Sequence, residues 1–280
     1  MLLTQFCPRF TTAALLVGAA LFAAAPARAL QCGDGPQNFP AWLAEFKQQA
    51  AADGVSPRTI QAALAGVTYD AKVISRDRGQ GGVFHRSFED FSRRLVTPSR
   101  VAKGRALMQR HAALLRGIEQ RYGVPGAVIV AIWGLETSYG ADNGNIKIFN
   151  ALATLAYDCR RAETFTQELL DALRIVERGY MAPSQMRGDW AGEIGQTQLM
   201  PSSYLKYAVD YDGDGTRDLI HDTADALAST ANFLAQKGWR RGAGYHQGEA
   251  NFDVLQEWNK AQVYVQTIGA LADRLGGAPE

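Results

Sequence analysis

Apolar residues recur along most of the chain at the three- to four-residue spacing of helices, and no segment clearly signals a strand. The first two segments with this spacing are Phe39–Asp53 and Pro57–Ala65, and Gly54 and Gly66 follow them as helix-ending residues. The stretch Asp70–Val83 combines charged residues with several glycines, and its apolar residues show no helical spacing. The N-terminal part therefore predicts two short amphipathic helices and then an irregular connection.

Longer helices are predicted downstream. Thr97 and Pro98 form a strong helix start, with Thr97 as N-cap and Pro98 at the first helical position, and Gly123 ends this helix. The remaining predicted helices are Pro125–Tyr139, Arg161–Tyr180, Pro201–Val209, Thr223–Lys237 and Phe252–Leu275. The pattern predicts a mainly α fold of one catalytic body with accessory helices at its N-terminus.

Residues 1–29 resemble a secretory signal peptide. Arg9 is the only charge in the first ten residues, Thr11–Ala25 is small and apolar, and Ala27-Arg28-Ala29 matches an A-x-A cleavage pattern. A membrane-spanning helix is the alternative, but the apolar run is shorter than the roughly 20 residues that a bilayer requires. We expect export to an oxidising compartment, which is the periplasm in a Gram-negative cell.

Without this segment the charge of the chain is nearly balanced. Arg9 and Arg28 are lost, so the 29 basic side chains fall to 27 against 28 acidic ones. No basic run is present, which argues against nucleic acid as a partner. About 250 residues are enough for one large domain or a domain with a lobe.

Two cysteines, Cys32 and Cys159, remain in the mature chain. An even pair in an exported protein favours a disulfide, and two buried free thiols are the alternative. A lipid anchor on Cys32 is disfavoured, because Gln31 precedes it where such sites have a small residue.

Glu136 is the first candidate for chemistry. Apart from Tyr139 it is the only ionisable side chain in the apolar helix Pro125–Tyr139, and it lies in the last turn. Burial and the negative end of the helix dipole both raise the pKa of a carboxyl group there. A carboxylic acid that keeps its proton near neutral pH suits cleavage of a glycosidic bond. The alternative is a structural glutamate that accepts hydrogen bonds from the amides of residues 142–144.

The segment Gly188–Tyr207 contains the second candidate group. Glycines allow a backbone to approach a ligand closely, and amide side chains bind sugar hydroxyl and N-acetyl groups. The alternative is an ordinary glycine-rich connection. Its glycines and polar residues are Gly188, Asp189, Gly192, Glu193, Gly195, Gln196 and Gln198.

Together these motifs resemble those of the B-type lytic murein transglycosylases (glycoside hydrolase family 103). The resemblance rests on E-T-S-Y-G at Glu136–Gly140 and G-x-x-A-G-x-x-G-x-x-Q-x-M-P-S-S at Gly188–Ser203. It extends from about Cys32 to Gly276. Further matching segments are Asn150–Asp158, Tyr207–Leu219 and W-N-x-x-x-x-Y at Trp258–Tyr264.

The resemblance implies a goose-lysozyme-like α-helical catalytic domain with a smaller α lobe. We expect an N-terminal helical segment over residues 30–96 and the lysozyme-like core and lobe over residues 97–280. The implied reaction cleaves the β-1,4 bond between N-acetylmuramic acid and N-acetylglucosamine without water and leaves a 1,6-anhydromuramyl end. It needs no metal or organic cofactor, and the expected partners are peptidoglycan strands and unidentified cell-wall synthesis proteins. The enzyme is expected to be a monomer.

The same resemblance assigns the site residues. Glu136 is the single carboxyl, acting first as acid and then as base. Gln198 and Asn259 contact the saccharide, and Tyr264 is expected to form a hydrogen bond near Glu136 or to a sugar. Asp189 stands where one member of the family has serine, and we include it among the substrate contacts.

Two function alternatives remain open. Glu193 stands where one member of the family has alanine, so a second carboxylate could lie near the cleavage point. With Asp189, Glu193 or Asp142 as a base, the enzyme would be a hydrolytic muramidase. In the other alternative, the chain is a peptidoglycan-binding module without catalysis.

Residues 210–216 follow the opening of an EF-hand loop. Asp210, Asp212 and Asp214 take positions 1, 3 and 5, a glycine takes position 6, and Thr216 would offer its carbonyl at position 7. The usual glutamate at position 12 is absent. The resemblance implies a structural calcium loop that a later aspartate closes, best matched by Asp225, with Asp222 nearby. The alternative is a turn that holds no ion.

Overall fold

The structure is a computed structural model that describes residues 31–80 and 87–276, so the predicted signal peptide lies outside the described residues. The fold is mainly α-helical, as the sequence predicts. The elements are η1 (Pro36–Asn38), α1 (Phe39–Ala52), α2 (Pro57–Leu64), α3 (Ala71–Gly79), α4 (Phe88–Leu95), α5 (Pro98–Arg110), α6 (Ala112–Tyr122), α7 (Gly126–Thr137), β1 (Ile146–Lys147), α8 (Ile148–Tyr157), α9 (Ala162–Glu177), β2 (Arg187–Gly188), α10 (Pro201–Tyr207), α11 (Thr223–Gln236), α12 (Phe252–Trp258) and α13 (Gln262–Gly276).

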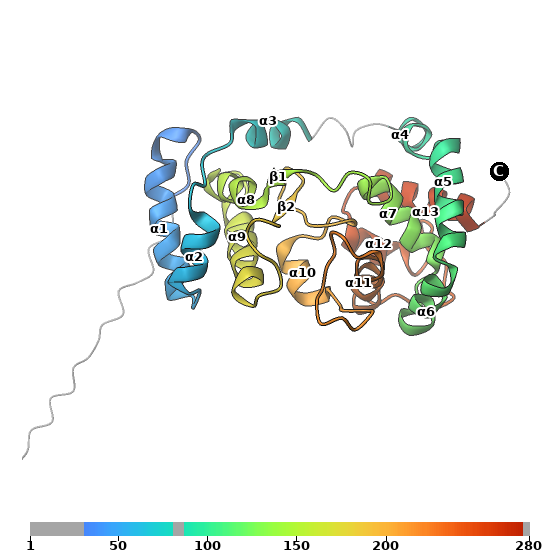
Figure 1. The fold of residues 1–280 in the computed structure, drawn as a ribbon. Helices are drawn as coiled ribbons and strands as arrows, with labels where there is room; N and C mark the ends of the chain where they lie inside the picture. Colours follow the sequence, from blue (N-terminus) through green and yellow to red (C-terminus); the bar gives the residue numbers. More distant parts are fainter. Residues whose placement is uncertain (1–30, 81–86, 277–280) are drawn as a thin grey trace, which may run out of the picture.

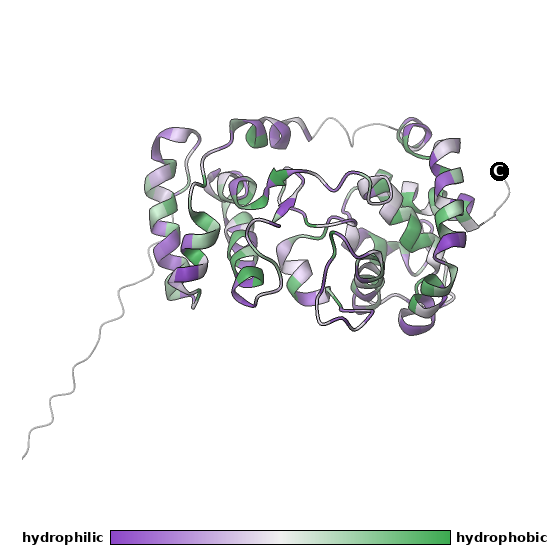
Figure 2. Cartoon of the chain, in the orientation of Figure 1, coloured by the Kyte–Doolittle hydropathy of each residue, from purple (hydrophilic) through white to green (hydrophobic). Residues whose placement is uncertain are grey.

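The helices form two groups that lie side by side (Figure 1). In one group α1 and α2 pack against α8 and α9, and in the other α5, α6, α11 and α13 pack around α7. The helix α10 contacts both α9 and α11 and so joins the groups. Hydrophilic residues are frequent on the outlying helices α1, α5 and α6 (Figure 2).

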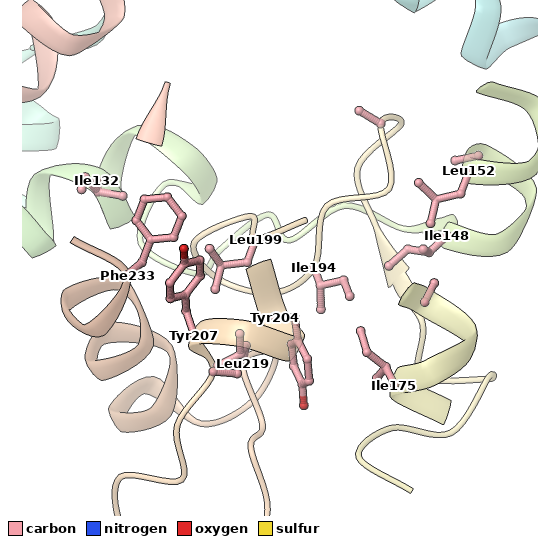
Figure 3. Close-up of a cluster of buried hydrophobic side chains, with 14 of the residues drawn as sticks. Ile132, Ile148, Leu152, Ile175, Ile194, Leu199, Tyr204, Tyr207, Leu219 and Phe233 are labelled. Atoms are coloured by element: carbon pink, nitrogen blue, oxygen red, sulfur yellow. The ribbon is translucent and has the colours of Figure 1, made fainter. Parts of the chain in front are cut away.

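The hydrophobic core is continuous between the two groups (Figure 3). Ile194 and Leu199, from the loop that follows β2, lie between the side chains of α8 and α9 and those of α7 and α11. Ile194 is fully buried. Since burial of apolar area is the main favourable term in folding, this shared core holds the loop and both helical groups in one body.

The stretch predicted to be irregular contains α3 instead. The side chain of Asp70 caps this helix by accepting a hydrogen bond from the amide of Lys72 at 2.9 Å. Asp77, which is 1 % exposed, forms ion pairs with three arginines, Arg78, Arg160 and Arg161. Two of these partners come from the distant loop before α9. The prediction was wrong because long-range ion pairs stabilise a segment that has weak local helical character.

Two helices predicted as continuous are broken. The helix that begins at Pro98 is interrupted at His111, where α5 ends and α6 begins. The C-terminal helix is interrupted at Asn259, whose backbone is extended and whose Oδ1 accepts a hydrogen bond from the amide of Ala261 at 2.9 Å. Both α5 and α6 pack on α7, but α5 also contacts α13 whereas α6 also contacts α11. The last residue of α12, Trp258, and Tyr264 of α13 both reach Glu136.

Two helices, α4 and α8, were not predicted. The helix α8 is buried on every side, so it shows no alternation of apolar and polar positions. The short strands β1 and β2 pair antiparallel, with Ile146 opposite Gly188. The segment before residue 96 contacts both groups, since α1 and α2 pack on α8 and α9 while α4 packs on α13; the division at residue 96 stays a prediction. Within residues 31–80 and 87–276 no helix has the length and hydropathy needed to span a bilayer.

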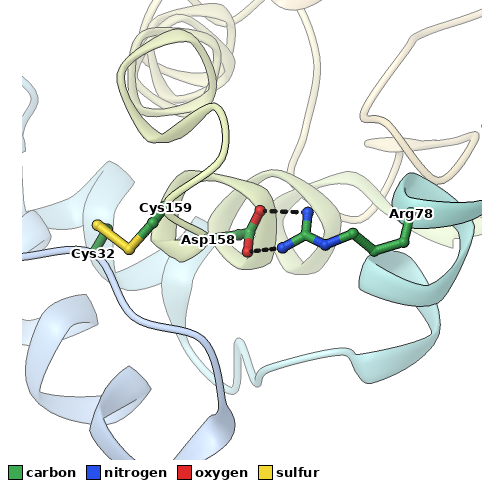
Figure 4. Close-up of a disulfide and its surroundings, with 4 residues drawn as sticks. All are labelled: Cys32, Arg78, Asp158 and Cys159. Carbon is green, nitrogen blue, oxygen red and sulfur yellow. Dashed lines mark hydrogen bonds and ion pairs between the residues drawn. A yellow bond between two sulfur atoms is a disulfide. The ribbon is translucent and has the colours of Figure 1, made fainter. Parts of the chain in front are cut away.

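Cys32 and Cys159 form a disulfide that attaches the N-terminal segment to the end of α8 (Figure 4). Their Cα atoms are 5.0 Å apart, and 127 residues separate them in the sequence. Beside the disulfide, Arg78 donates two hydrogen bonds to the carboxylate of Asp158, at 3.0 and 2.6 Å. The Sγ atom of Cys32 is bonded to sulfur and is therefore not available to carry a lipid.

Reduction of this disulfide is expected to destabilise the mature protein. Because the bond closes a loop of more than a hundred residues, the chain-entropy model gives a loss of up to about 4–5 kcal/mol in the free energy of unfolding. Denaturant unfolding of the oxidised protein, the reduced protein and the double variant Cys32→Ser, Cys159→Ser measures this loss. The reduced protein and the variant should agree, and two titratable thiols in the unfolded, unreduced protein would show that the bond is absent.

Candidate active site around Glu136

Glu136 lies in the last turn of α7. Most of this helix is buried, and Pro125 precedes it as N-cap. Two non-glycine residues with positive φ, Ser138 (53°) and Tyr139 (65°), end the helix directly after the glutamate. Left-handed conformations of such residues cost energy and cluster at functional sites. The Tyr139 hydroxyl donates to the carbonyl of Arg100 at 2.8 Å and holds this turn in place.

One oxygen of Glu136 accepts two hydrogen bonds. The indole Nε1 of Trp258, at the end of α12, donates to Oε1 at 3.0 Å, and the hydroxyl of Tyr264, in α13, donates to the same atom at 2.8 Å. The Trp258 ring packs edge-on against Phe233, and the Tyr264 ring packs edge-on against Phe91. Both donors are therefore held in position by aromatic contacts.

This geometry distinguishes the two carboxyl oxygens of Glu136. Both donors bind Oε1, and no side chain of the described residues donates to Oε2. A proton on the carboxyl group therefore resides best on Oε2, the oxygen that does not already accept. The side chain is only partly buried, so solvent reaches the group.

The pKa of Glu136 is raised to about 7, chiefly by burial and to a smaller extent by the negative charge of Asp189. The hydrogen bonds from Trp258 and Tyr264 oppose this shift, because they stabilise the carboxylate. A carboxyl group with a pKa near 7 is present in both protonation states at neutral pH. It can therefore donate a proton and take one back in a single reaction cycle.

The glycine-rich segment after β2 lies beside Glu136. Gln196 is buried, and its Nε2 donates to the carbonyl of Ile220 at 3.2 Å, so it anchors this segment instead of facing solvent. Gln198 is only partly buried and has a positive φ of 57°. Its Nε2 donates to the carbonyl of Gly195 at 2.7 Å. Of the two amides, Gln198 is the one that a ligand can reach.

Asp189 and Glu193 bring two further carboxyl groups to the site. Asp189 pairs with Arg76 of α3 at 3.7 Å, and its charge acts on Glu136. Glu193 is close enough to Glu136 and Tyr264 for the charges to interact. The structure thus places Asp189, Glu193 and Tyr264 near Glu136.

Asn259 and Trp258 lie at the break between α12 and α13. The side-chain oxygen of Asn259 accepts from the amide of Ala261, so its Nδ2 is the group left for a saccharide. Sequence reasoning assigned no catalytic contact to Trp258, although it begins the W-N-x-x-x-x-Y motif. The motif could have indicated this role for Trp258, since its first and last residues both donate hydrogen bonds to Glu136.

The predicted calcium loop gathers three carboxylates. Ligand oxygens of Asp210, Asp212 and Asp214 lie within 4.8 Å of one another. Each also accepts hydrogen bonds from amides of the loop, and Thr216 donates both its amide and its hydroxyl to Asp214. Hard oxygen donors at this spacing suit calcium.

Asp225 is not one of these three carboxylates, and its role as the residue that closes the loop stays a prediction. Its carboxylate accepts hydrogen bonds from the amides of Tyr211 and Asp218, at 2.7 and 2.9 Å. Burial raises the pKa of Asp225 to about 6. Because both of its oxygens bind the backbone, Asp225 holds the two ends of the loop together.

The sequence pattern that defines the transglycosylase SLT domain matches residues 38–248. Membrane-bound lytic murein transglycosylase B of Escherichia coli (strain K12) is 39% identical over 153 residues, which are 54% of this chain and 42% of that protein. The alignment therefore spans less than half the length of this curated relative.

Solved structures give broader matches. SltB3 from Pseudomonas aeruginosa, in complex with NAG-NAM-pentapeptide, superposes with a TM-score of 0.79 and 33% identity, over 86% of this chain and 80% of that chain. The Escherichia coli lytic transglycosylase SLT35 in complex with calcium superposes with a TM-score of 0.75 and 26% identity, over 88% of this chain and 96% of that chain. These neighbours have a lysozyme-like fold, as the sequence predicts for this chain.

Replacing Glu136 by glutamine is expected to stabilise the protein at alkaline pH. The carboxyl has a pKa of about 7 in the folded protein and an ordinary value of 4.5 when unfolded. Between these values the unfolded chain releases its proton while the folded chain keeps it, so the folded state loses stability as pH rises through this window. The full penalty, at most about 3 kcal/mol, applies above pH 7.

Chemical denaturation at pH 4 and pH 8 checks this expectation. Glu136→Gln should be more stable than the wild type at pH 8 and close to it at pH 4. The exposed Glu45 of α1, replaced by glutamine, is the control. An equal difference at both pH values would contradict the expectation.

Proposed function

The chain belongs to the transglycosylase SLT domain family, in its B type, and from this premise we propose that it is a lytic murein transglycosylase. Its substrate is the glycan strand of peptidoglycan, cut at the β-1,4 bond between N-acetylmuramic acid and N-acetylglucosamine. The observation that carries the proposal is the carboxyl of Glu136, with a pKa of about 7 and both protein donors on Oε1.

In the first step, Glu136 donates the proton on Oε2 to the glycosidic oxygen. The bond between the muramyl C1 and this oxygen breaks, and the N-acetylglucosamine side leaves with the proton. Positive charge develops on the muramyl ring, and the N-acetyl oxygen of the same sugar stabilises it. The hydrogen bonds from Trp258 and Tyr264 strengthen as the carboxylate forms, which favours the transition state.

In the second step, the Glu136 carboxylate takes a proton from the C6 hydroxyl of the muramyl sugar. The C6 oxygen bonds to C1, which gives the 1,6-anhydro end and restores the acid. No water is consumed and no cofactor takes part. Gln198 and Asn259 orient the glycan, and Asp189 contributes to the negative field that keeps Glu136 protonated.

We infer that the enzyme works in the periplasm, since residues 1–29 have the pattern of a signal peptide and the cysteine pair suits an oxidising compartment. Calcium is proposed as a structural ion of residues 210–216, held by Asp210, Asp212 and Asp214 with the carbonyl of Thr216. It would neutralise the repulsion among the three carboxylates and supply no reacting group.

Activity is tested by digestion of purified sacculi with the wild type and Glu136→Gln. The wild type should release anhydromuropeptides, which mass spectrometry distinguishes from hydrolytic products because they are lighter by one water. Glu136→Gln should lose about 10²–10⁴-fold in rate, the usual worth of general acid catalysis. Glu45→Gln is again the control. Reducing muramyl ends would identify a hydrolase, and retention of more than a tenth of the activity by Glu136→Gln would remove this residue from the catalytic role.

Calcium binding is expected to raise the melting temperature, because an ion that binds only the folded state stabilises it by mass action. Thermal unfolding in millimolar calcium, magnesium and chelator measures the effect. Asp212→Ala together with Asp214→Ala should abolish the rise while changing activity little. Superimposable curves with calcium and with chelator would mean that the loop holds no ion.

A further inference from the structure

Glu193 carries a carboxyl group near Glu136 and has no role in the two proposed reaction steps. It precedes Ile194, which bridges Gly188 and Leu199 in antiparallel fashion and is fully buried. Glu193 itself is only partly buried, whereas the Ile194 side chain lies in the core. Glu193 lies close enough to Glu136 and Tyr264 for an electrostatic influence between these groups.

The backbone around Glu193 has little freedom. Gly192 has a φ of 90°, and a Cβ atom placed there would lie 2.3 Å from Cδ2 of Leu152. A Cβ on Gly188 would lie 1.8 Å from the carbonyl oxygen of Glu193 itself. Other residues of the same protein therefore pack directly on this loop and restrict the position of the Glu193 backbone.

The charges around Glu193 are mostly negative. Glu136 of α7 and Asp189 of the loop after β2 face it, together with the hydroxyl of Tyr264 from α13. Arg161, before α9, is the nearby cation, but its guanidinium group is already paired with Asp77. Burial, with Glu136 and Asp189 adding to it, raises the pKa of Glu193 to about 8. The group is therefore a neutral acid at neutral pH.

The carboxyl of Glu193 lacks a side-chain partner. Among residues 31–80 and 87–276, no other side chain forms a hydrogen bond or ion pair with it; only its own amide approaches it. A protonated carboxyl group has one O–H donor. A donor that faces a substrate site without a protein acceptor is available to a ligand, and the ligand oxygen must be uncharged because the surrounding carboxylates repel anions.

We propose that the carboxyl group of Glu193 donates a hydrogen bond to an uncharged sugar oxygen of the glycan bound beside Glu136 and so contributes to substrate affinity. The inference rests on the proposed function, because it takes the glycan as the ligand. Glu193 is a binding residue in this scheme and does not exchange protons with the reacting bond. Once Glu193 ionises it can no longer donate, so affinity falls as pH rises through its titration.

Replacement of Glu193 by glutamine or by alanine distinguishes a hydrogen-bond donor from a merely structural residue. Glutamine keeps an N–H donor and never ionises, whereas alanine removes the donor. On solubilised glycan strands at pH 7, Glu193→Gln should keep the KM of the wild type within about twofold, and Glu193→Ala should raise KM about 3- to 10-fold with little change in kcat, as for one net hydrogen bond. A merely structural role would affect both variants alike.

A second test measures ligand binding in the absence of catalysis. In Glu136→Gln, the affinity for soluble NAG-NAM-pentapeptide, measured by calorimetry, should be lower at pH 9.5 than at pH 5.5. This difference should vanish when Glu193→Gln is added. The same difference in both proteins, or no binding at pH 5.5, would overturn the inference. Failure of the wild type to release muropeptides would instead count against the proposed function, and the binding comparison would still decide the role of Glu193.

Discussion

The burial of α7 is the constraint on which the rest of this structure depends. A helix that is apolar on nearly every face must be covered on every face, and α5, α6, α11 and α13 supply that cover. The chain has to leave the helix at its last turn, where Ser138 and Tyr139 adopt left-handed conformations. The one carboxyl group of the helix, Glu136, therefore lies where the core meets solvent.

At this position the pKa of Glu136 is subject to two opposing effects. Burial favours the neutral acid, and hydrogen bonds from Trp258 and Tyr264 favour the carboxylate. With burial alone the group would be a weak acid that gives up its proton with difficulty, and with the hydrogen bonds alone it would be ionised at neutral pH. The resulting pKa of about 7 leaves both forms accessible, which acid and then base catalysis by one group requires.

The N-terminal segment contributes to the electrostatics of the site as well as to the fold. The disulfide and the bidentate pair of Arg78 with Asp158 attach this segment to the end of α8. From α3, Arg76 reaches Asp189, and the buried Asp77 pairs with Arg161, which lies near Glu193. Because Asp77 is buried, removal of its arginine partners would leave an uncompensated charge in the interior.

Sequence alone determined what contiguous residues encode: the mainly α fold, the apolar helix after Pro125, Glu136 as its single carboxyl group, and the three aspartates of residues 210–216. Tertiary structure decided the rest. The break at Asn259 is visible only where Trp258 and Tyr264 meet Glu136, and α3 depends on arginines from a distant loop. The reason is physical: hydrogen bonds, ion pairs and burial between residues far apart in the chain leave no periodic trace in the local order of amino acids.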